Sequence, residues 1–303
     1  MEQFDLIVIG SGPAGEKGAA QAAYFGKKVA IIEQAAHIGG AGINTGTVPS
    51  KTLRETALYY SGLRQRGLYG IDYSLRENLT IEQFMHRKQL VIEREWDIIS
   101  RNLARHNIQL LQGRAQLKDA HTVSVQTAAG TTDYRGEIIL IATGSAPVRP
   151  PGIPFDQRLI YDSDDILCME RIPKSMLVVG GGVIGTEYAS IFTALGVDVT
   201  LIDPRGCILP FLDDEIAQRL MDQLQQLGLK FLLNDRMASI AARNDKVEIL
   251  LESGGSRSFD IALIAAGRQS NVQGLGLEAV GVQLGNRGLV LVNEKFQTAV
   301  PNI

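Results

Sequence analysis

Cysteine is scarce in this sequence, and its scarcity argues against several kinds of chemistry. Only two cysteines occur among 303 residues, Cys168 and Cys207, and they lie far apart without the spacing of a Cys-x-x-C motif or a zinc site. We interpret them as unpaired small apolar residues. The histidines also lack metal-ligand spacing, so we expect no metal centre; they are His37, His86, His106 and His121.

Long hydrophobic runs and an excess of basic side chains are missing as well. The longest apolar runs, such as residues 138–142, are far too short to span a bilayer. The first residues show no basic segment ahead of an apolar stretch, so they indicate no secretory signal. A formal net charge of −3 offers no electrostatic surface for nucleic acid or an anionic membrane. We therefore expect a cytoplasmic protein that binds small molecules and neither nucleic acid nor membranes.

What the sequence does contain is an internal repeat. Residues 5–15 read DLIVIGSGPAG and residues 175–185 read SMLVVGGGVIG, so each copy runs from a short buried strand into a glycine-rich turn. Each turn is followed by a helical pattern and a second apolar strand, with the helices at residues 14–25 and 183–195 and the strands at 28–33 and 198–203. The repeat predicts an α/β protein with two Rossmann-like, three-layer dinucleotide-binding domains.

Further signals divide the chain into parts. Each copy closes on a related strand that ends in glycine, IILIATG at residues 138–144 and IALIAAG at residues 261–267. Helices are inserted into the first copy between residues 50 and 107, and the capping box from Thr80 to Gln83 opens one of them. A proline-rich linker lies at residues 147–154. We predict domains at residues 1–150 and 151–272, and a return segment at 273–303 that is cut short.

The glycine turns have the spacing that a bound diphosphate requires. Gly10 permits the tight turn, Gly12 the close approach of pyrophosphate, and Gly15 the packing of helix on strand. Pro13 and Ala14 open the helix, whose N-terminus attracts anions. In the second copy the same roles fall to Gly180, Gly182 and Gly185. An acidic residue ends the second strand of each copy, Glu33 and Asp203, where its carboxylate can accept hydrogen bonds from ribose hydroxyls.

With these motifs in this order, the chain resembles the FAD-dependent pyridine nucleotide-disulfide oxidoreductases, such as glutathione reductase and dihydrolipoamide dehydrogenase, over nearly its whole length. The resemblance implies that the first copy binds FAD and the second NAD or NADP. It implies FAD contacts at Gly10, Gly12, Pro13, Ala14, Gly15, Glu33, Gly40, Thr45, Thr47, Lys51, Ala115, Thr143 and Gly144. For the nicotinamide nucleotide it implies Gly180, Gly182, Val183, Ile184, Gly185, Glu187, Asp203, Arg205 and Gly267.

The segment GGAGINTGTVPSK at residues 39–51 looks like the redox-disulfide stretch of that family, but Gly42 and Thr47 occupy the two cysteine positions. Neither side chain can form a thiolate or a disulfide, so the family's thiol relay is excluded. Threonine at the second position is what the soluble pyridine nucleotide transhydrogenases of the family show. The segments IYDSDDIL (160–167) and GVIGTEYASIF (182–192) also look like their counterparts in those enzymes.

Lys51 and Glu187 are the candidate catalytic residues. Lys51 follows Ser50, a candidate N-cap, which would place the lysine cation in the first turn of a helix. Glu187 falls on an apolar helical stripe, where a carboxylate needs a partner. The resemblance implies that the lysine and the glutamate form an ion pair beside the flavin. It also places Val183 where glutathione reductases carry a gating tyrosine, so we expect open access for nucleotides.

The predicted function is hydride transfer between NADPH and NAD⁺ through FAD by a Si-specific NAD(P)⁺ transhydrogenase. Asp203 suits the ribose of NAD, and Arg205 can bind the 2′-phosphate of NADP, so we expect both nucleotides to be accepted. Two alternatives stay open: an NAD(P)H oxidase or diaphorase, and a catalytically silent nucleotide-binding remnant. By resemblance the full-length protein is a homodimer. The resemblance implies a following Gly-Asp, whose aspartate binds the ribityl chain of the flavin, and then a dimerisation domain. Both are absent from these residues, so we expect this chain alone to bind FAD poorly and not to dimerise.

Overall fold

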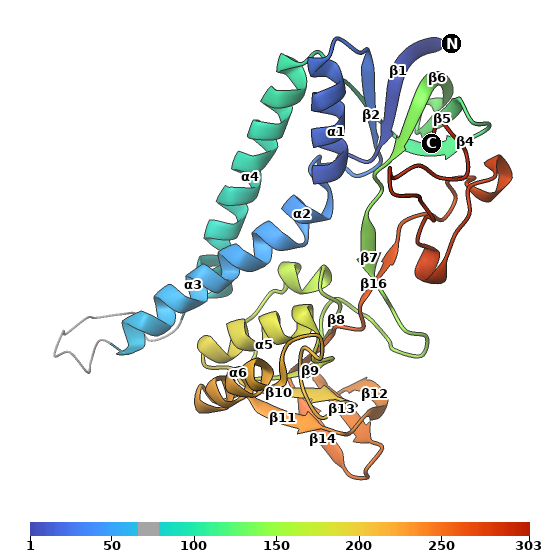
Figure 1. Cartoon of the computed structure of the whole chain (residues 1–303). Coiled ribbons are helices and arrows are strands. Elements are labelled where there is room, and N and C mark those ends of the chain that lie inside the picture. Colours follow the sequence, from blue (N-terminus) through green and yellow to red (C-terminus); the bar gives the residue numbers. More distant parts are fainter. Residues whose placement is uncertain (66–78) are drawn as a thin grey trace. The chain divides into compact units, whose positions relative to one another are not determined.

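The computed structural model describes residues 1–65 and 79–303, and it divides the chain into two compact units (Figure 1). The first unit comprises Met1–Thr47, Ile92–Ala146 and Arg268–Ile303, and the second comprises Val48–Val91 and Pro147–Gly267. Each unit contains a parallel strand-helix-strand core within a larger sheet, so the expected α/β fold class with two Rossmann-like domains is confirmed.

The first unit is built on a six-stranded mixed sheet in the order β3-β2-β1-β6-β5-β4. Its strands are β1 (Glu2–Ile9), β2 (Val29–Glu33), β3 (Gln109–Gln112), β4 (Arg114–Leu117), β5 (Thr122–Thr127) and β6 (Gly130–Ile141). The first three strands and β6 are parallel neighbours, whereas β4 and β5 extend the sheet in antiparallel fashion. Every residue of β2 is buried, as expected for a parallel strand that is covered on both faces.

Helices cover one face of this sheet, and the C-terminal segment covers the other (Figure 1). The helices are α1 (Pro13–Tyr24), the short α2 (Gly40–Asn44) and, from residue 92 onward, the second half of α4 (Ile81–Arg105). On the far face, side chains near the C-terminus pack against strand residues in one apolar cluster; among them are Leu275, Leu277, Val282 and Ile303. The chain also forms the strand pair β7 (Ser145–Pro147) and β16 (Arg268–Ser270), and the 3₁₀ turns Glu278–Val280 and Asn286–Gly288.

The second unit has three layers around a five-stranded parallel sheet in the order β11-β10-β9-β15-β8. These strands are β8 (Ile160–Tyr161), β9 (Ser175–Val179), β10 (Asp198–Asp203), β11 (Lys230–Leu233) and β15 (Ile261–Ile264). One apolar cluster joins this sheet to α5 (Val183–Ala194) and α6 (Asp214–Gln226). A second cluster joins it to an antiparallel sheet made of β12 (Met237–Arg243), β13 (Lys246–Leu251) and β14 (Ser256–Phe259).

Residues 48–91, which the sequence placed with the first domain, group with the second unit. The cause is apolar packing: Leu53 and Ala57 on α3 (Thr47–Gln65) and Phe84 on α4 are buried in the same cluster as Phe192 of α5. Phe84 and Phe192 meet edge to face, with ring centroids 6.3 Å apart. The limits of the domains as ligand-binding regions, near residues 150 and 272, stay a prediction.

The helix and the second strand lie within one residue of the expected limits in both copies, whereas β1 begins at Glu2, three residues before the repeat. The capping box at α4 is confirmed, because the N–H of Gln83 donates to Oγ1 of Thr80 and the N–H of Thr80 donates to Oε1 of Gln83. The prediction of Ser50 as an N-cap is wrong, since α3 already begins at Thr47. Pro49 explains the error: it is tolerated in a first helical turn, where an N–H has no intrahelical acceptor.

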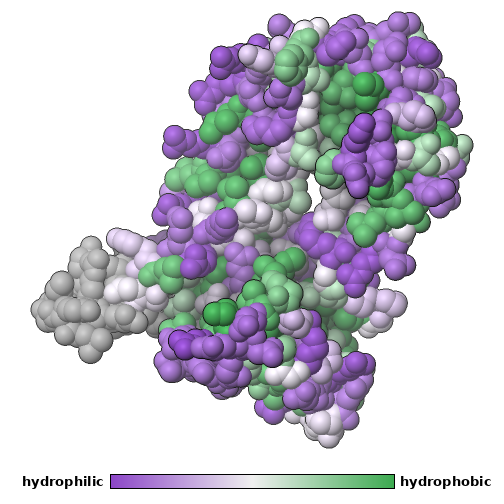
Figure 2. Space-filling model, viewed as in Figure 1, coloured by the Kyte–Doolittle hydropathy of each residue, from purple (hydrophilic) through white to green (hydrophobic). Residues whose placement is uncertain are grey.

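Within residues 1–65 and 79–303, no helix is long and apolar enough to cross a bilayer. On the face drawn in Figure 2, hydrophilic residues predominate and hydrophobic ones gather in several small patches between them.

Candidate dinucleotide-binding sites

The first glycine turn is fixed by close backbone contacts that only glycine allows. Gly10 has a φ of 107°, and a Cβ there would collide with the carbonyl oxygen of Ala142. A Cβ on Gly15 would collide with the carbonyl oxygen of Gly10. The turn is therefore compressed between β1, β6 and the start of α1, as the glycine spacing predicted.

Gly12 differs, because the space beside it is open. It caps α1 with extended backbone angles, φ −63° and ψ 177°, and Pro13 follows as the first helical residue. Of the described atoms, a Cβ on Gly12 would approach only Cα of Gly40, at 3.8 Å. Glycine is thus not needed here for packing within the protein. An open approach to a helix N-terminus fits a diphosphate group.

The second turn repeats this arrangement. Gly180 has a φ of 108°, and a Cβ there would meet the carbonyl oxygen of Ala265, while a Cβ on Gly185 would collide with the carbonyl oxygen of Gly180. Gly182 caps α5, and no described atom lies within 4 Å of its added Cβ. The same division therefore holds in both copies: two glycines serve the turn, and one leaves an approach open.

Each turn is braced by the acidic residue of its copy. Oε2 of Glu33 accepts hydrogen bonds from the N–H and Oγ of Ser11, at 2.9 and 2.6 Å, and Oε1 accepts one from Ala35. Oδ2 of Asp203 accepts a hydrogen bond of 2.6 Å from the N–H of Gly181. The sequence interpretation missed Ser11 and Gly181. Their common separation of 22 residues from the acid was the signal that could have revealed them.

Asp203 is also bound to Arg205. The N–H and Nε of Arg205 donate to Oδ1, at 2.9 and 2.7 Å, and its NH2 donates to Oδ2 at 2.7 Å. Burial of Asp203 raises its pKa, but the hydrogen bonds from Arg205 and Gly181 outweigh burial and hold the pKa below the usual value. The arginine predicted for the 2′-phosphate is thus partnered within the protein, and its side chain stays 45% exposed.

The ion pair implied for Lys51 and Glu187 is not formed. Oε1 of Glu187 accepts a hydrogen bond of 3.1 Å from Oγ of Ser50 instead, and none of the ion pairs in the described parts of the chain joins Lys51 to Glu187. Successive residues of a helix point about 100° apart, so when Ser50 faces α5 its neighbour Lys51 is directed elsewhere and is exposed. Glu187 is half-buried. The catalytic roles of both residues stay predictions.

The two positions that carry cysteine in the resembling family lie on separate helices. Gly42 belongs to α2, and Thr47 is the first residue of α3. A Cβ on Gly42 would come within 3.0 Å of Cγ of Pro13, so any larger side chain there requires the proline ring to move. The turn of the first copy is therefore packed around the absence of a side chain at residue 42.

The other predicted contact residues are placed as follows, and their roles stay predictions. Ala115 is buried in β4, and the carbonyl groups of Thr143 and Gly144 accept hydrogen bonds from Asn271, both at 3.0 Å. The carbonyl of Gly267 accepts one from Val148 at 2.9 Å. In the helical segments, Ala14 and Val183 are exposed, whereas Gly40, Thr45 and Ile184 are half-buried.

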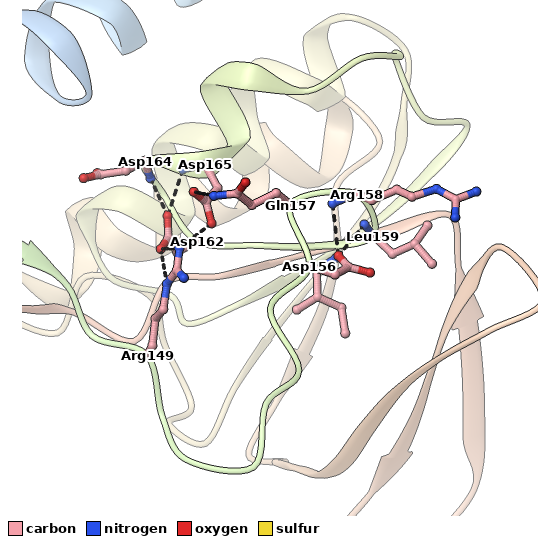
Figure 3. A network of polar contacts seen from close by, with 9 residues as sticks. Arg149, Asp156, Gln157, Arg158, Leu159, Asp162, Asp164 and Asp165 are labelled. Atoms are coloured by element: carbon pink, nitrogen blue, oxygen red, sulfur yellow. Dashed lines mark hydrogen bonds and ion pairs between the residues drawn. The ribbon is translucent and has the colours of Figure 1, made fainter. Parts of the chain in front are cut away.

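A charged network in the second unit was not foreseen from the sequence (Figure 3). Nε of Arg149 donates to Oδ2 of Asp162 at 2.7 Å, and its NH2 donates to Asp165. Oδ1 of Asp162 accepts the N–H groups of Asp164 and Asp165, both at 2.8 Å. Burial and the neighbouring Asp162 raise the pKa of Asp165 despite its contact with Arg149. The network ties the proline-rich linker to the segment IYDSDDIL.

No group of three or more His, Cys, Asp or Glu residues that could hold a metal occurs within the described ranges. Cys168 and Cys207 are free thiols, the first exposed and the second half-buried.

Comparison with known proteins identifies the family of the chain and several similar proteins. The family model described as pyridine nucleotide-disulphide oxidoreductase matches residues 4–303. The soluble pyridine nucleotide transhydrogenase of Mycobacterium bovis (strain BCG / Pasteur) is 40% identical over 305 residues, which cover 100% of this chain and 65% of that protein. That of Chromohalobacter salexigens is 38% identical, with the same coverage. The chain thus spans about 65% of the length of the curated relatives it matches.

Solved structures agree on the fold. The Cu(II) complex of the HOCl-induced flavoprotein disulfide reductase RclA from Escherichia coli has a TM-score of 0.87 and 31% identity, and covers 100% of this chain and 65% of its own. LpdA from Mycobacterium tuberculosis has a TM-score of 0.89 and 27% identity, with 98% and 65% coverage.

Proposed function

The chain belongs to the pyridine nucleotide-disulphide oxidoreductase family, whose members bind FAD and a pyridine nucleotide, and on that premise we propose that its complete protein is a soluble transhydrogenase that moves hydride from NADPH to NAD⁺. The observation that carries this proposal is the pair Gly42 and Thr47, which stand where the disulfide reductases of the family have cysteines. Without a thiol pair, electrons that enter the flavin as hydride cannot pass to a disulfide, so they have to leave from the flavin itself, and we propose hydride transfer to NAD⁺ as that route.

The first copy supplies the residues that would hold FAD. The open approach at Gly12 and the N-terminus of α1 fit its diphosphate, and Glu33 fits a ribose hydroxyl. The second copy would hold the nicotinamide nucleotide in the same manner, with Gly182 at the diphosphate and Asp203 with Arg205 at the adenosine ribose. In this proposal bound FAD would supply the hydride chemistry between a reduced and an oxidised nucleotide.

The chain's own side chains set the conditions for that exchange. Val183, 58% exposed at the first residue of α5, stands by resemblance at the position of the gating tyrosine of glutathione reductases, so we propose that no bulky side chain has to rotate before a nucleotide enters. Lys51 is proposed to favour negative charge on the reduced ring, and Glu187 to orient the nicotinamide side of the site. The similarity of the chain to relatives named soluble pyridine nucleotide transhydrogenases supports the proposed hydride transfer. The cytoplasmic location and the homodimer of the complete protein stay predictions.

A stopped-flow experiment tests the proposal. The complete protein, loaded with FAD, is mixed anaerobically with NADPH and then with NAD⁺ while flavin absorbance is recorded. We expect the absorbance to fall with NADPH and to recover with NAD⁺. Both phases should survive alkylation of Cys168 and Cys207 with iodoacetamide, because neither thiol takes part.

Other outcomes of this experiment would indicate one of the two alternative functions. Recovery with oxygen or a quinone but not with NAD⁺ would identify an NAD(P)H oxidase or diaphorase. Protein that takes up no FAD, or whose flavin is reduced by neither NADPH nor NADH, would indicate the catalytically silent nucleotide-binding remnant.

A further inference from the structure

Trp96 on α4, the only tryptophan of the sequence, is hydrogen-bonded to Asn44, the last residue of α2. Its Nε1 donates a hydrogen bond of 2.8 Å to Oδ1 of Asn44. Its ring stacks on the imidazole of His37, with centroids 3.8 Å apart and an interplanar angle of 7°. Nδ2 of Asn44 donates to the carbonyl groups of Ile38 and Gly40, at 3.0 and 2.9 Å. One indole therefore fixes both ends of residues 37–44.

The same helix is bonded to α1 six residues further on. Nδ2 of Asn102 donates a hydrogen bond to Oε1 of Glu16, a buried carboxylate that also pairs with Lys17 at 2.8 Å. A cavity of about 470 Å³ is lined by residues of α1, α2 and α4, among them Pro13, Ile43 and Ile99. Glu16 and Asn102 both line this cavity, so their hydrogen bond joins α1 to α4 beside it.

Residues 37–44, which Trp96 contacts, lie against the first glycine turn. We call this turn together with Gly39 and Gly40 the dinucleotide cradle of the first copy, and we call the two glycines its wall. The N–H of Gly39 donates to Oγ of Ser11 at 3.1 Å, and a Cβ on Gly40 would lie 2.7 Å from Cα of Gly12. Gly39 and Gly40 have φ values of 96° and 56°, so two successive left-handed glycines make this wall. Glycine loses more backbone freedom on ordering than any other residue, and such a wall needs external support.

We propose that Trp96 and Asn44 are positioning residues for the dinucleotide cradle of the first copy. They keep residues 37–44 against Gly12 before any ligand arrives, so that ligand binding does not have to order the glycine wall. The identity of the ligand as FAD rests on the proposed function; the support of the wall does not. His37 contributes only a stacking contact, and the hydrogen bond from Nε1 is the essential one.

The test compares Trp96→Phe with Ser100→Ala in the complete protein. Phenylalanine keeps a ring for His37 but removes the donor to Asn44, while Ser100 is an exposed residue of the same helix. In flavin-free protein we expect amide hydrogen exchange to accelerate at residues 37–44 in W96F and to stay unchanged at residues 180–185, the glycine turn of the second copy. The dissociation constant for FAD should rise about tenfold, the effect of one lost hydrogen bond. S100A should match the wild type in both measurements.

A second variant separates positioning from general destabilisation. Asn44→Asp keeps an acceptor for Trp96 but cannot donate to the two carbonyl groups, so it should weaken FAD binding at least as much as W96F. Unchanged exchange at residues 37–44 in W96F, or faster exchange with unchanged FAD affinity, would overturn the positioning role. Equal acceleration of hydrogen exchange at residues 37–44 and 180–185 would show that W96F only destabilises the protein as a whole, and it would also overturn the positioning role. Wild-type protein that takes up no FAD would refute the proposed function, whereas normal uptake by both wild type and W96F would refute the positioning role alone.

Discussion

Arg205 clamps Asp203 from two sides, because its Nε and NH2 each donate a hydrogen bond of 2.7 Å to a different oxygen of the carboxylate. Asp203 is 1% exposed and lies at the end of β10, beside the second glycine turn. Its charge is thereby compensated at the place where a nucleotide ribose is expected. The two side chains act as one unit, and a change in either alters the field that a 2′-phosphate meets.

The first prediction concerns Arg205→Ala. The substitution leaves the carboxylate of Asp203 uncompensated, which repels a 2′-phosphate more than a 2′-hydroxyl. We expect KM for NADPH to rise about tenfold or more, equivalent to about 1.4 kcal/mol, and KM for NADH to change by less than about threefold. Steady-state kinetics with both nucleotides measures this. Arg219→Ala is the matched control, since Arg219 forms only an exposed pair with Glu215. Equal changes for both nucleotides would contradict the prediction.

A second prediction separates the two kinds of glycine in the second turn. Gly182→Ala should fold normally, because no described atom lies within 4 Å of its Cβ, yet the new methyl group occupies the approach to the helix. We expect its melting temperature to stay within about 2 °C of the wild type and its NAD(P)H affinity to fall about tenfold or more. Gly185→Ala should lose about 3 kcal/mol or more, because its Cβ meets the carbonyl of Gly180. Calorimetry and nucleotide titration check both, and a stable G185A would refute the packing argument.

The hydrogen bond between Ser50 and Glu187 gives a third prediction. In a double-mutant cycle on unfolding free energy, Ser50→Ala and Glu187→Ala should show coupling of about 0.5–1.5 kcal/mol, since the two residues share one hydrogen bond and neither alanine can form it. Lys51→Met and Glu187→Gln should be additive within about 0.5 kcal/mol. Denaturant titrations of the flavin-free protein measure both cycles. Strong coupling between Lys51 and Glu187 would show that the ion pair implied by the family forms after all.

The crowded Asp165 gives a pH-dependent prediction. Its pKa is raised by burial and by Asp162, so its charged form is disfavoured in the folded state. The stability that protonation confers is complete below the unfolded-state pKa, about 3.9, and is lost as pH rises through the raised pKa. The advantage of Asp165→Asn over wild type should therefore be larger at pH 7 than at pH 3.5. Urea titrations at both values test this. Asp245→Asn, at an exposed ion pair, serves as the control and should show less pH dependence.

The parts of the fold that the sequence predicted are those with local causes. Gly15 is required by a contact with Gly10 inside its own turn, and the glycine spacing, together with the apolar runs and the helical pattern beside it, located β1, α1 and β2. The capping box of Thr80 and Gln83 is likewise a contact over three residues. Local rules failed at Ser50, where Pro49 could be accommodated inside the helix and the true start lies at Thr47.

What the sequence did not reveal depends on contacts between distant residues. Trp96 bonds to Asn44 across 52 positions, and Phe84 packs on Phe192 of a different chain segment. Neither pair follows a fixed spacing in the sequence, so no sequence motif predicts either contact. The role of Arg149 was not predicted either, because an arginine among prolines looks like an ordinary linker residue. Its contacts with Asp162 and Asp165 form only in the folded chain.

The two bracing acids differ in how many hydrogen bonds they already accept. Glu33 accepts three, from Ser11 twice and from Ala35, whereas Asp203 accepts four, one from Gly181 and three from Arg205. A carboxylate offers about four lone-pair positions, so the first acid retains a vacancy for a ribose hydroxyl and the second has none. A ligand at Asp203 must displace an existing donor. Residence times should therefore be long in the first copy and short in the second, the asymmetry that separates a permanently held group from one replaced in every turnover.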